Sequence, residues 1–227
     1  MAIVNVTPDS FSDGGERLRP AQAVDDGLRF VSEGADVVDV GGESTRPGSR
    51  PCAPEEELAR ILPVVEALVR QKVVVSVDTR RASVARACLD AGAAIVNDVS
   101  ALRDDVDLLP LMARCGAAVI LMHRRGWPES NYEGPAYGDV VEDVRRFLVE
   151  RATACEAAGI SRDCIALDPG VGFGKSVAEN LSLIAGVGHL AAAGYPVLIG
   201  ASRKGFIGKL AGGGDPRDRD PASVWLA

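Results

Sequence analysis

The sequence predicts an α/β fold in which parallel strands alternate with helices. Short apolar runs rich in Val and Ile recur along the 227 residues, and both faces of these runs are apolar, as in parallel strands covered by helices. Amphipathic segments lie between the runs. Several of these segments end at a glycine, which suits a left-handed helix cap. A regular alternation of strand and helix follows from these observations.

Seven runs are short, apolar and mostly β-branched, and we interpret them as strands. They are Ala2 to Val6, Asp36 to Val40, Val73 to Val77, Ala94 to Val96, Ala117 to Met122, Cys164 to Leu167 and Val197 to Ile199. The clearest helices are Glu55 to Arg70, which follows Pro54, and Asp139 to Ala158. We expect the acidic residues 55 to 57 to complement the helix dipole from solvent-exposed positions.

The glycines that suit helix caps are Gly34, Gly92, Gly159 and Gly194. Seven β-then-α units could form a doubly wound sheet or a TIM (β/α)8 barrel. Polar and glycine residues follow nearly every strand, whereas a doubly wound sheet concentrates them at one switch point. No GxGxxG motif follows the first strand. The barrel is therefore the predicted fold, with seven recognisable strands and no eighth strand or last helix in the sequence.

Composition excludes several classes of protein. A net charge of −7 argues against a nucleic-acid binder, which would need a basic surface. No apolar stretch approaches the ~18 residues of a membrane span, and no signal peptide is recognisable. The five cysteines lack metal-ligand spacing, and we interpret them as reduced thiols. We expect a cytoplasmic protein that binds neither nucleic acid nor membranes.

Polar groups follow the carboxyl ends of the predicted strands, and in a parallel barrel they converge on one face. They are Asn5 with 7 to 10, then 41 to 48, Asp78-Thr79, Asn97-Asp98, His123, 168 to 170, and Ser202-Arg203-Lys204. The oxygens of Asp78, Asn97 and Asp168 suit a flat heterocycle that offers N–H and NH2 groups, and Lys204 can donate to a ring nitrogen or oxygen. A pterin or purine edge fits this set.

Other strand-end groups suit an anion. The Thr45-Arg46 loop and a helix N-terminus near Ser202 offer hydrogen-bond donors and positive potential. Asn5 supplies an oxygen of the kind that Mg2+ accepts beside a diphosphate. Because the chain is acidic overall, we expect such local groups to hold any anionic ligand.

Six ordered motifs at these strand ends resemble the dihydropteroate synthase family. They are NVTPDSFSDGG (5 to 15), GGESTRPGS (41 to 49), SVDTRRASVARACLDAGAAIVNDVSAL (76 to 102), LMH (121 to 123), LDPGVGFGK (167 to 175) and SRKGFIG (202 to 208). The resemblance implies a TIM barrel of folate biosynthesis. Its members join 6-hydroxymethyl-7,8-dihydropterin diphosphate to 4-aminobenzoate and release diphosphate.

The resemblance also implies roles for single residues. The pterin pocket would comprise Asp78, Asn97, Asp168 and Lys204, with Met122 as its apolar lining. Asn5 would contact Mg2+ and the diphosphate. A mobile first loop would carry Asp9 and Phe11, and a mobile second loop would carry Thr45 and Arg46. The 4-aminobenzoate site would contain Phe173, Pro47 and Ser202. The residues expected to act in catalysis are Asn5, Thr45, Arg46 and Lys204.

The sequence departs from the family pattern in two places. HRRGWP (123 to 128) has Arg124 where the family has an apolar residue in an HMRG-like start. The chain also begins inside the first strand and stops at Ala227, before an eighth strand with an Arg-x-His motif. We therefore expect residues 1–227 to be a single pterin-binding domain that is truncated at both ends, mainly the C-terminus.

Two alternatives share the pterin-binding barrel. One is a methyltransferase that uses methyltetrahydrofolate, which would not need the STRPG loop or the SRKGFIG segment. The other is a noncatalytic pterin-binding homologue, which an incomplete diphosphate site permits. The resemblance also implies a possible homodimer.

Overall fold

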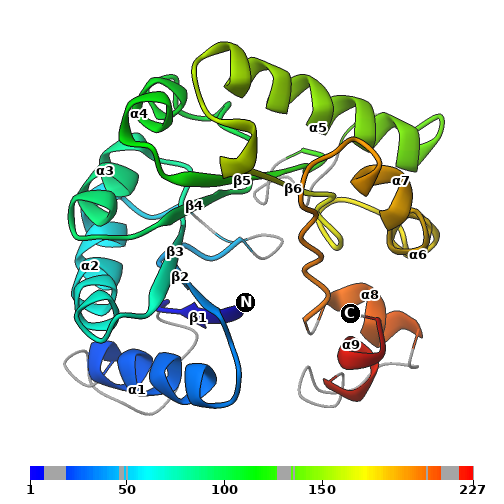
Figure 1. The fold of residues 1–227 in the computed structure, drawn as a ribbon. Coiled ribbons are helices and arrows are strands. Elements are labelled where there is room, and N and C mark those ends of the chain that lie inside the picture. Colours follow the sequence, from blue (N-terminus) through cyan, green and yellow to red (C-terminus); the bar gives the residue numbers. More distant parts are fainter. Residues whose placement is uncertain are drawn as a thin grey trace.

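The computed structural model describes residues 1–7, 19–45, 49, 51–126, 134, 136–202, 204–210 and 220–226. Strands and helices alternate as predicted from residue 2 to residue 185, and only helices follow among the described residues (Figure 1). In chain order they are β1 (Ala2–Asn5), α1 (Arg19–Ser32), β2 (Val37–Gly41), α2 (Pro54–Arg70), β3 (Val74–Asp78), α3 (Ala82–Asp90), β4 (Ile95–Asp98), α4 (Leu108–Cys115), β5 (Ala118–Met122), α5 (Val140–Ala157), β6 (Ile165–Asp168), α6 (Val177–Ala185), α7 (Val187–Ala191), α8 (Gly205–Leu210) and α9 (Asp220–Leu226), with a 3-10 turn at Arg162–Cys164.

Six of the predicted strands form one curved sheet in the order β1 to β6, and every neighbouring pair is parallel. The seventh, Val197 to Ile199, is reduced to a single parallel bridge between Leu167 and Val197. Two backbone hydrogen bonds of 2.9 Å each accompany it, from the Leu167 N–H to the Pro196 carbonyl and from the Leu198 N–H to the Leu167 carbonyl. Pro196 has no N–H to donate, which shortens the ladder at this edge.

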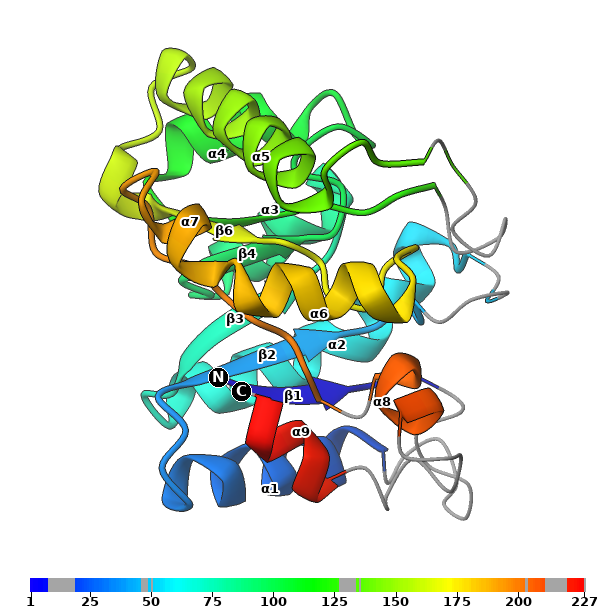
Figure 2. The same cartoon turned by 90° about the vertical axis from the view of Figure 1, so that its right-hand side faces the viewer.

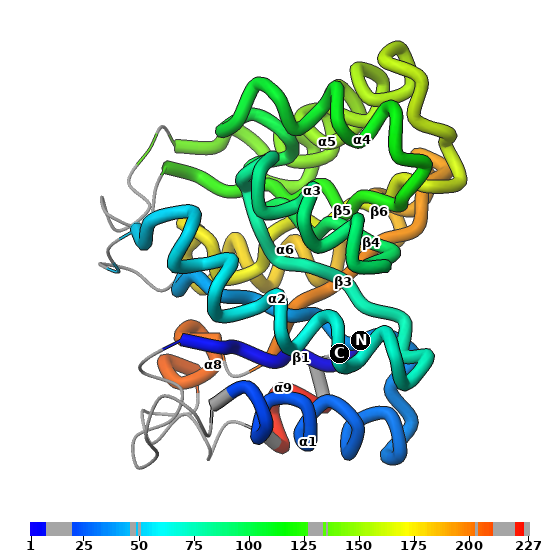
Figure 3. Tube along the Cα trace, turned by 90° about the vertical axis from the view of Figure 1, so that its left-hand side faces the viewer, coloured from blue at the N-terminus to red at the C-terminus, as the bar shows by residue number. Residues whose placement is uncertain are grey.

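Helices cover the outer face of the sheet. Figure 3 shows α1 to α4 following one another across that face. Alternate strand residues such as Val38, Val40, Val75 and Val77 point outward into a buried cluster with Leu68 of α2. A second cluster joins β4, β5 and β6 to α4 and α5. The remaining strand residues therefore face the inside of the barrel, because successive side chains alternate between the two faces.

The predicted helix ends are confirmed. Gly34, Gly92, Gly159 and Gly194 all have positive φ, between 81° and 106°, a region that glycine enters without a steric penalty. Asp139 caps α5, because its side chain accepts hydrogen bonds from the Val141 and Glu142 N–H groups. In the described residues no helix is long and apolar enough to cross a membrane.

The prediction that residues 55 to 57 are all solvent-exposed is wrong for Glu57. Its side chain is completely buried and forms an ion pair with Arg81, which follows β3. The guanidinium compensates the buried carboxylate. A partner 24 positions away in the chain left no signal in the local helix pattern.

Candidate functional site

The carboxyl ends of the strands bring the predicted polar residues to one face. The strand arrows in Figure 2 point toward the side on which α8 lies. The β1–β4 register aligns Asn5 with Gly41, Gly41 with Asp78, and Asp78 with Asn97. On the other half of the sheet, Met122 pairs with Asp168. Five of the predicted site residues therefore share the rim of one half-open barrel.

Gly41 separates two of these side chains. A Cβ built there would lie 3.4 Å from Asp78 Oδ2 and 3.5 Å from Asn5 Oδ1. A side chain at position 41 would therefore fill the space between them. The glycine leaves both oxygens free to face a ligand, although Asn5 itself is exposed.

Lys204 and two carboxylates make up the charged centre of the site. Burial raises the pKa of Asp78 well above its usual range, and nearby carboxylates add to the rise while Lys204 opposes it. Burial also raises the pKa of Asp168, whose Oδ1 accepts a 2.7 Å hydrogen bond from the Gly170 N–H. Burial lowers the pKa of Lys204, and Asp168 and Asp78 counteract that shift. One ammonium group thus interacts with both acids in a poorly solvated site.

The loop between β6 and α6 brings Phe173 to Lys204. The Lys204 ammonium lies 4.0 Å from the centre of the Phe173 ring, a cation–π contact. Gly172 makes room for the lysine stem, because a Cβ there would lie 2.8 Å from Lys204 Cδ. Gly172 also has φ +85°. The predicted pterin residue and the predicted 4-aminobenzoate residue are therefore in direct contact.

Lys175 holds this loop in place. Its ammonium donates to three backbone carbonyls, at 2.8 Å to Gly170, 3.1 Å to His123 and 3.2 Å to Phe173. All three protons of the ammonium therefore have acceptors. These contacts join the end of β5 to the loop that carries Phe173. The sequence analysis did not single out Lys175, although it closes the GFGK motif.

Asp39 is a second residue that sequence reasoning missed. It lies inside the barrel on β2 and is buried, and its Oδ2 accepts a 3.0 Å hydrogen bond from Asn97 Nδ2. Burial raises the pKa of Asp39, and the neighbouring Ser76 and Asn97 side chains offset part of that rise. The sequence could have identified Asp39 from its place in the middle of the apolar run VVDVG. A carboxylate in such a run indicates a buried partner, because it is costly to bury without one.

Asp98, next to Asn97, has a different role. Its carboxylate accepts from the Ser100 N–H and hydroxyl, both at 2.8 Å, and from the Leu102 N–H at 2.6 Å. These bonds hold Ala101 and Leu102 in left-handed conformations, with φ of 56° and 60°. Asp98 therefore stabilises the loop after β4, whereas Asn97 faces the barrel interior.

Charged residues connect the loops around the rim. Glu43 accepts from Arg80 Nε at 2.9 Å and from Arg81 Nη2 at 2.7 Å. Asp104 accepts from Arg124 Nη2 at 2.6 and 2.7 Å and from Arg80 Nη1 at 3.5 Å. Arg124, the departure noted in the sequence, is thus a buried ion-pair partner. These five residues, the rim network, join the loops that follow β2, β3, β4 and β5.

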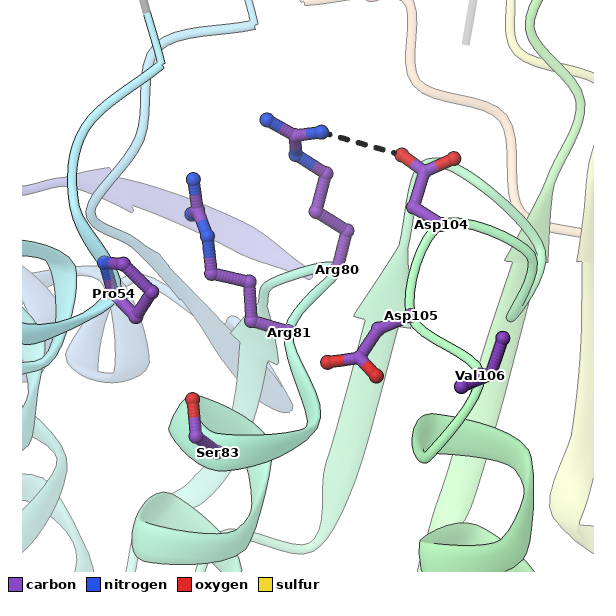
Figure 4. A pocket seen from close by; sticks show the side chains of 7 residues that line it. All are labelled: Pro54, Arg80, Arg81, Ser83, Asp104, Asp105 and Val106. Carbon is purple, nitrogen blue, oxygen red and sulfur yellow. Dashed lines mark hydrogen bonds and ion pairs between the residues drawn. The ribbon is translucent and has the colours of Figure 1, made fainter.

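A cavity of about 460 Å3 lies beside the rim network (Figure 4). Its lining residues are Pro54, Arg80, Arg81, Ser83, Asp104, Asp105 and Val106. In Figure 4 the dashed line joins Arg80 to Asp104 across the cavity. Each of the two arginines has a carboxylate partner. We assign no ligand to this cavity, because its charges already compensate one another.

The remaining predicted residues lie at the edge of the described structure or outside it. Thr45 is half-buried. It is the last residue of the described segment 19–45, two residues after Glu43. Ser202 is exposed, just before α8. Arg46 and Pro47 lie outside the described residues, as do Asp9, Phe11 and Arg203. The described residues contain no cluster of three or more His, Cys, Asp or Glu that could hold a metal ion.

Comparisons with known proteins show the family of this chain. The family model described as pterin binding enzyme matches residues 1–227. The dihydropteroate synthase of Mycobacterium leprae (strain TN) is 49% identical over 222 residues, which cover 97% of this chain and 78% of that protein. That of Escherichia coli (strain K12) is 44% identical over 228 residues, which cover 100% of this chain and 80% of that protein.

A solved structure shows the same fold. Xanthomonas albilineans dihydropteroate synthase with 4-aminobenzoic acid superposes with a TM-score of 0.91 at 48% identity, over 99% of this chain and 81% of that one. A likeness of this extent and identity covers the barrel and its strand-end loops together. The chain therefore belongs to the pterin-binding enzyme family and, within it, to the dihydropteroate synthases.

Proposed function

We propose that this chain condenses 6-hydroxymethyl-7,8-dihydropterin diphosphate with 4-aminobenzoate to give 7,8-dihydropteroate and diphosphate. The observation that carries the proposal is Lys204, which interacts with Asp78 and Asp168 and touches Phe173. The related enzyme from Xanthomonas albilineans has been solved in complex with 7,8-dihydropteroate. It is 46% identical and superposes with a TM-score of 0.89.

In this proposal the pterin ring lies among Asp78, Asn97, Asp168 and Lys204, above Met122. The carboxylates and the Asn97 amide accept hydrogen bonds from the ring N–H and NH2 groups, and Lys204 donates to a ring oxygen or nitrogen. The raised pKa values of both carboxyls reflect the scarcity of water around them. Donors on a ligand would replace the water that burial removes.

The 4-aminobenzoate would lie against Phe173, with Pro47 and Ser202 around it and its carboxylate near the start of α8. The contact between Phe173 and Lys204 supports this arrangement, because it joins the two predicted subsites. Thr45 and Arg46 would close over the diphosphate. The reaction breaks the bond between C9 and the diphosphate oxygen and forms one between C9 and the aniline nitrogen, so no side chain needs to act as a nucleophile.

Mg2+ is part of the proposal as a partner of the substrate diphosphate. Asn5 offers a single amide oxygen, which fits Mg2+ only if phosphate oxygens and water complete the coordination. When bound, the ion would stabilise negative charge on the leaving diphosphate.

The proposal describes residues 1–227 as one pterin-binding domain with small-molecule substrates. It includes a cytoplasmic location and a homodimer, as the sequence analysis expects. Size-exclusion chromatography with light scattering tests the dimer.

A turnover assay tests the reaction itself. The chain is incubated with both substrates and Mg2+, and dihydropteroate and diphosphate are measured by mass spectrometry and a coupled colour reaction. We expect equal amounts of both products from the wild type and none from Asp168→Ala. A chain that binds the pterin but forms no dihydropteroate would support the noncatalytic alternative. Transfer of a methyl group from methyltetrahydrofolate would support the methyltransferase alternative.

A further inference from the structure

The contact between Asp39 and Asn97 suggests a role for a residue outside the proposed pterin pocket. Asn97 is aligned with Asp78 on the rim, and Asp78 with Gly41. Asp39 is two residues earlier than Gly41 on β2, so it shares the inward face one layer deeper in the barrel. Its carboxylate therefore contacts Asn97 from below the rim.

This contact decides which end of the Asn97 amide faces the pocket. Asp39 Oδ2 accepts the hydrogen bond in this contact, so the NH2 end of the amide faces Asp39. Asn97 Nδ2 does lie 3.0 Å from Asp39 Oδ2. The opposite end, Oδ1, is buried and has no hydrogen-bond partner among the described residues. A buried acceptor without a partner is costly, and a ligand N–H would remove that cost.

We propose that Asp39 is a positioning residue that fixes the Asn97 amide with its carbonyl oxygen toward the pterin, so that Asn97 reads an N–H donor of the ring. The inference rests on the proposed function, because it takes the pterin as the ligand. Asp39 acts through Asn97 and need not touch the substrate. Without the carboxylate, the amide could rotate and present its NH2 group to the ring N–H, two donors facing each other.

Asp39→Leu removes the acceptor and tests the role directly. We expect its pterin affinity, measured by calorimetry, to fall on the order of 10-fold, the effect of one buried hydrogen bond. Asp39→Asn keeps an oxygen that can accept from Asn97 Nδ2, so we expect it to lose less than about 3-fold. In an Asn97→Leu background, Asp39→Leu should weaken binding no further. An equal loss in both backgrounds would show that Asp39 does not act through Asn97.

Asp98→Asn is the matched control. Asp98 is a buried aspartate of β4, adjacent to Asn97, but its carboxylate contacts the following loop. We expect Asp98→Asn to lower the melting temperature while the folded protein keeps its pterin affinity. If Asp98→Asn loses as much pterin affinity as Asp39→Leu, general destabilisation explains both losses and the proposal is overturned.

Nuclear magnetic resonance reads the amide orientation without any ligand. The chain has four asparagines, so selective 15N labelling gives few side-chain signals, and Asn97→Asp identifies the relevant one. We expect one Nδ2 proton to be shifted downfield by its hydrogen bond in the wild type and in Asp39→Asn, and to return toward the shift of a free side-chain amide in Asp39→Leu. An unchanged NMR signal in Asp39→Leu would contradict the role of Asp39. A wild type that binds no pterin in the calorimetry would instead contradict the proposed function.

A swap of the two side chains provides the sharpest test. Asn97→Asp alone places two carboxylates against each other, and we expect pterin affinity to fall on the order of 10-fold. Adding Asp39→Asn restores a donor at position 39, and the new carboxylate at position 97 again presents an oxygen to the ring. We expect the double variant to recover most of the affinity. A double variant that binds as weakly as Asn97→Asp contradicts the proposal.

Discussion

Arg124→Met should destabilise the fold through the rim network. The variant removes a guanidinium whose Nη2 lies 2.6 and 2.7 Å from the two Asp104 oxygens, while the methionine keeps much of the apolar volume. Both side chains are nearly inaccessible, with exposed fractions of 4% for Arg124 and 8% for Asp104. The variant therefore leaves a buried carboxylate without its nearest cation.

The expected cost follows from this burial. Removing one partner of a buried ion pair costs about 3–5 kcal/mol. Asp104 keeps Arg80 Nη1 at 3.5 Å, so the free energy of unfolding should fall by an amount at the lower end, about 3 kcal/mol. Replacing Asp104 by leucine in the same chain removes the stranded charge. We expect the double variant to regain about 2 kcal/mol.

Urea unfolding followed by circular dichroism measures these differences. Arg146→Met is the matched control, because its ion pair with Asp143 is exposed, with an arginine exposed fraction of 68%. The control should change the free energy of unfolding by less than about 0.5 kcal/mol. An Arg124→Met variant as stable as this control would refute the reasoning. So would strictly additive effects in the double variant.

Three further predictions concern the barrel face. Lys175→Met should lower the free energy of unfolding by roughly 3 kcal/mol in urea titrations, because three carbonyls lose a donor. Gly172→Ala should weaken pterin binding about 10-fold in calorimetry because its Cβ collides with Lys204, whereas Gly188→Ala, with open space around it, should not. Burial lowers the pKa of His123 to about 3, so the unfolded chain binds the extra proton first, and stability should fall by up to about 5 kcal/mol between pH 6.5 and 3. In denaturation curves measured at successive pH values, His123→Phe should reduce the loss of unfolding free energy on acidification. If this free energy falls as steeply with pH in the variant as in the wild type, His123 is not its cause.

Local patterns predicted most of the fold. The six confirmed strands begin and end within two residues of their expected bounds. Their bounds could be predicted because β-branched runs favour strands, and glycines end helices, through local backbone preferences. The run at Val197 was harder, because Pro196 removes a ladder donor and leaves one bridge. Edge effects of this kind depend on the neighbouring strand.

The site was predictable where a residue follows a strand. Parallel strand ends meet on one face, so Asp78, Asn97 and Asp168 could be grouped in advance. Asp39 was missed because it lies in mid-strand, where a carboxylate is not expected to face a barrel interior. Its partner Asn97 is 58 positions away, and such pairing is visible only in the folded chain.

Long-range ion pairs explain the other differences. The sequence around Glu57 predicts an exposed helix start, whereas in the structure Glu57 is buried and paired with Arg81. Arg124 was recognised as a departure from the family pattern, but its acceptor Asp104 lies 20 positions earlier in the chain. The sequence indicates that a charge is unusual, and only packing identifies what neutralises it.

The central claim is that the strand-end residues around Lys204 hold the pterin ring. Titration calorimetry with 6-hydroxymethyl-7,8-dihydropterin diphosphate tests it most directly, with the wild type compared with Asp168→Asn, which preserves shape and removes the acceptor charge. We predict one binding site per chain in the wild type and an affinity loss on the order of 100-fold in the variant. Equal affinities for the two proteins would contradict the claim.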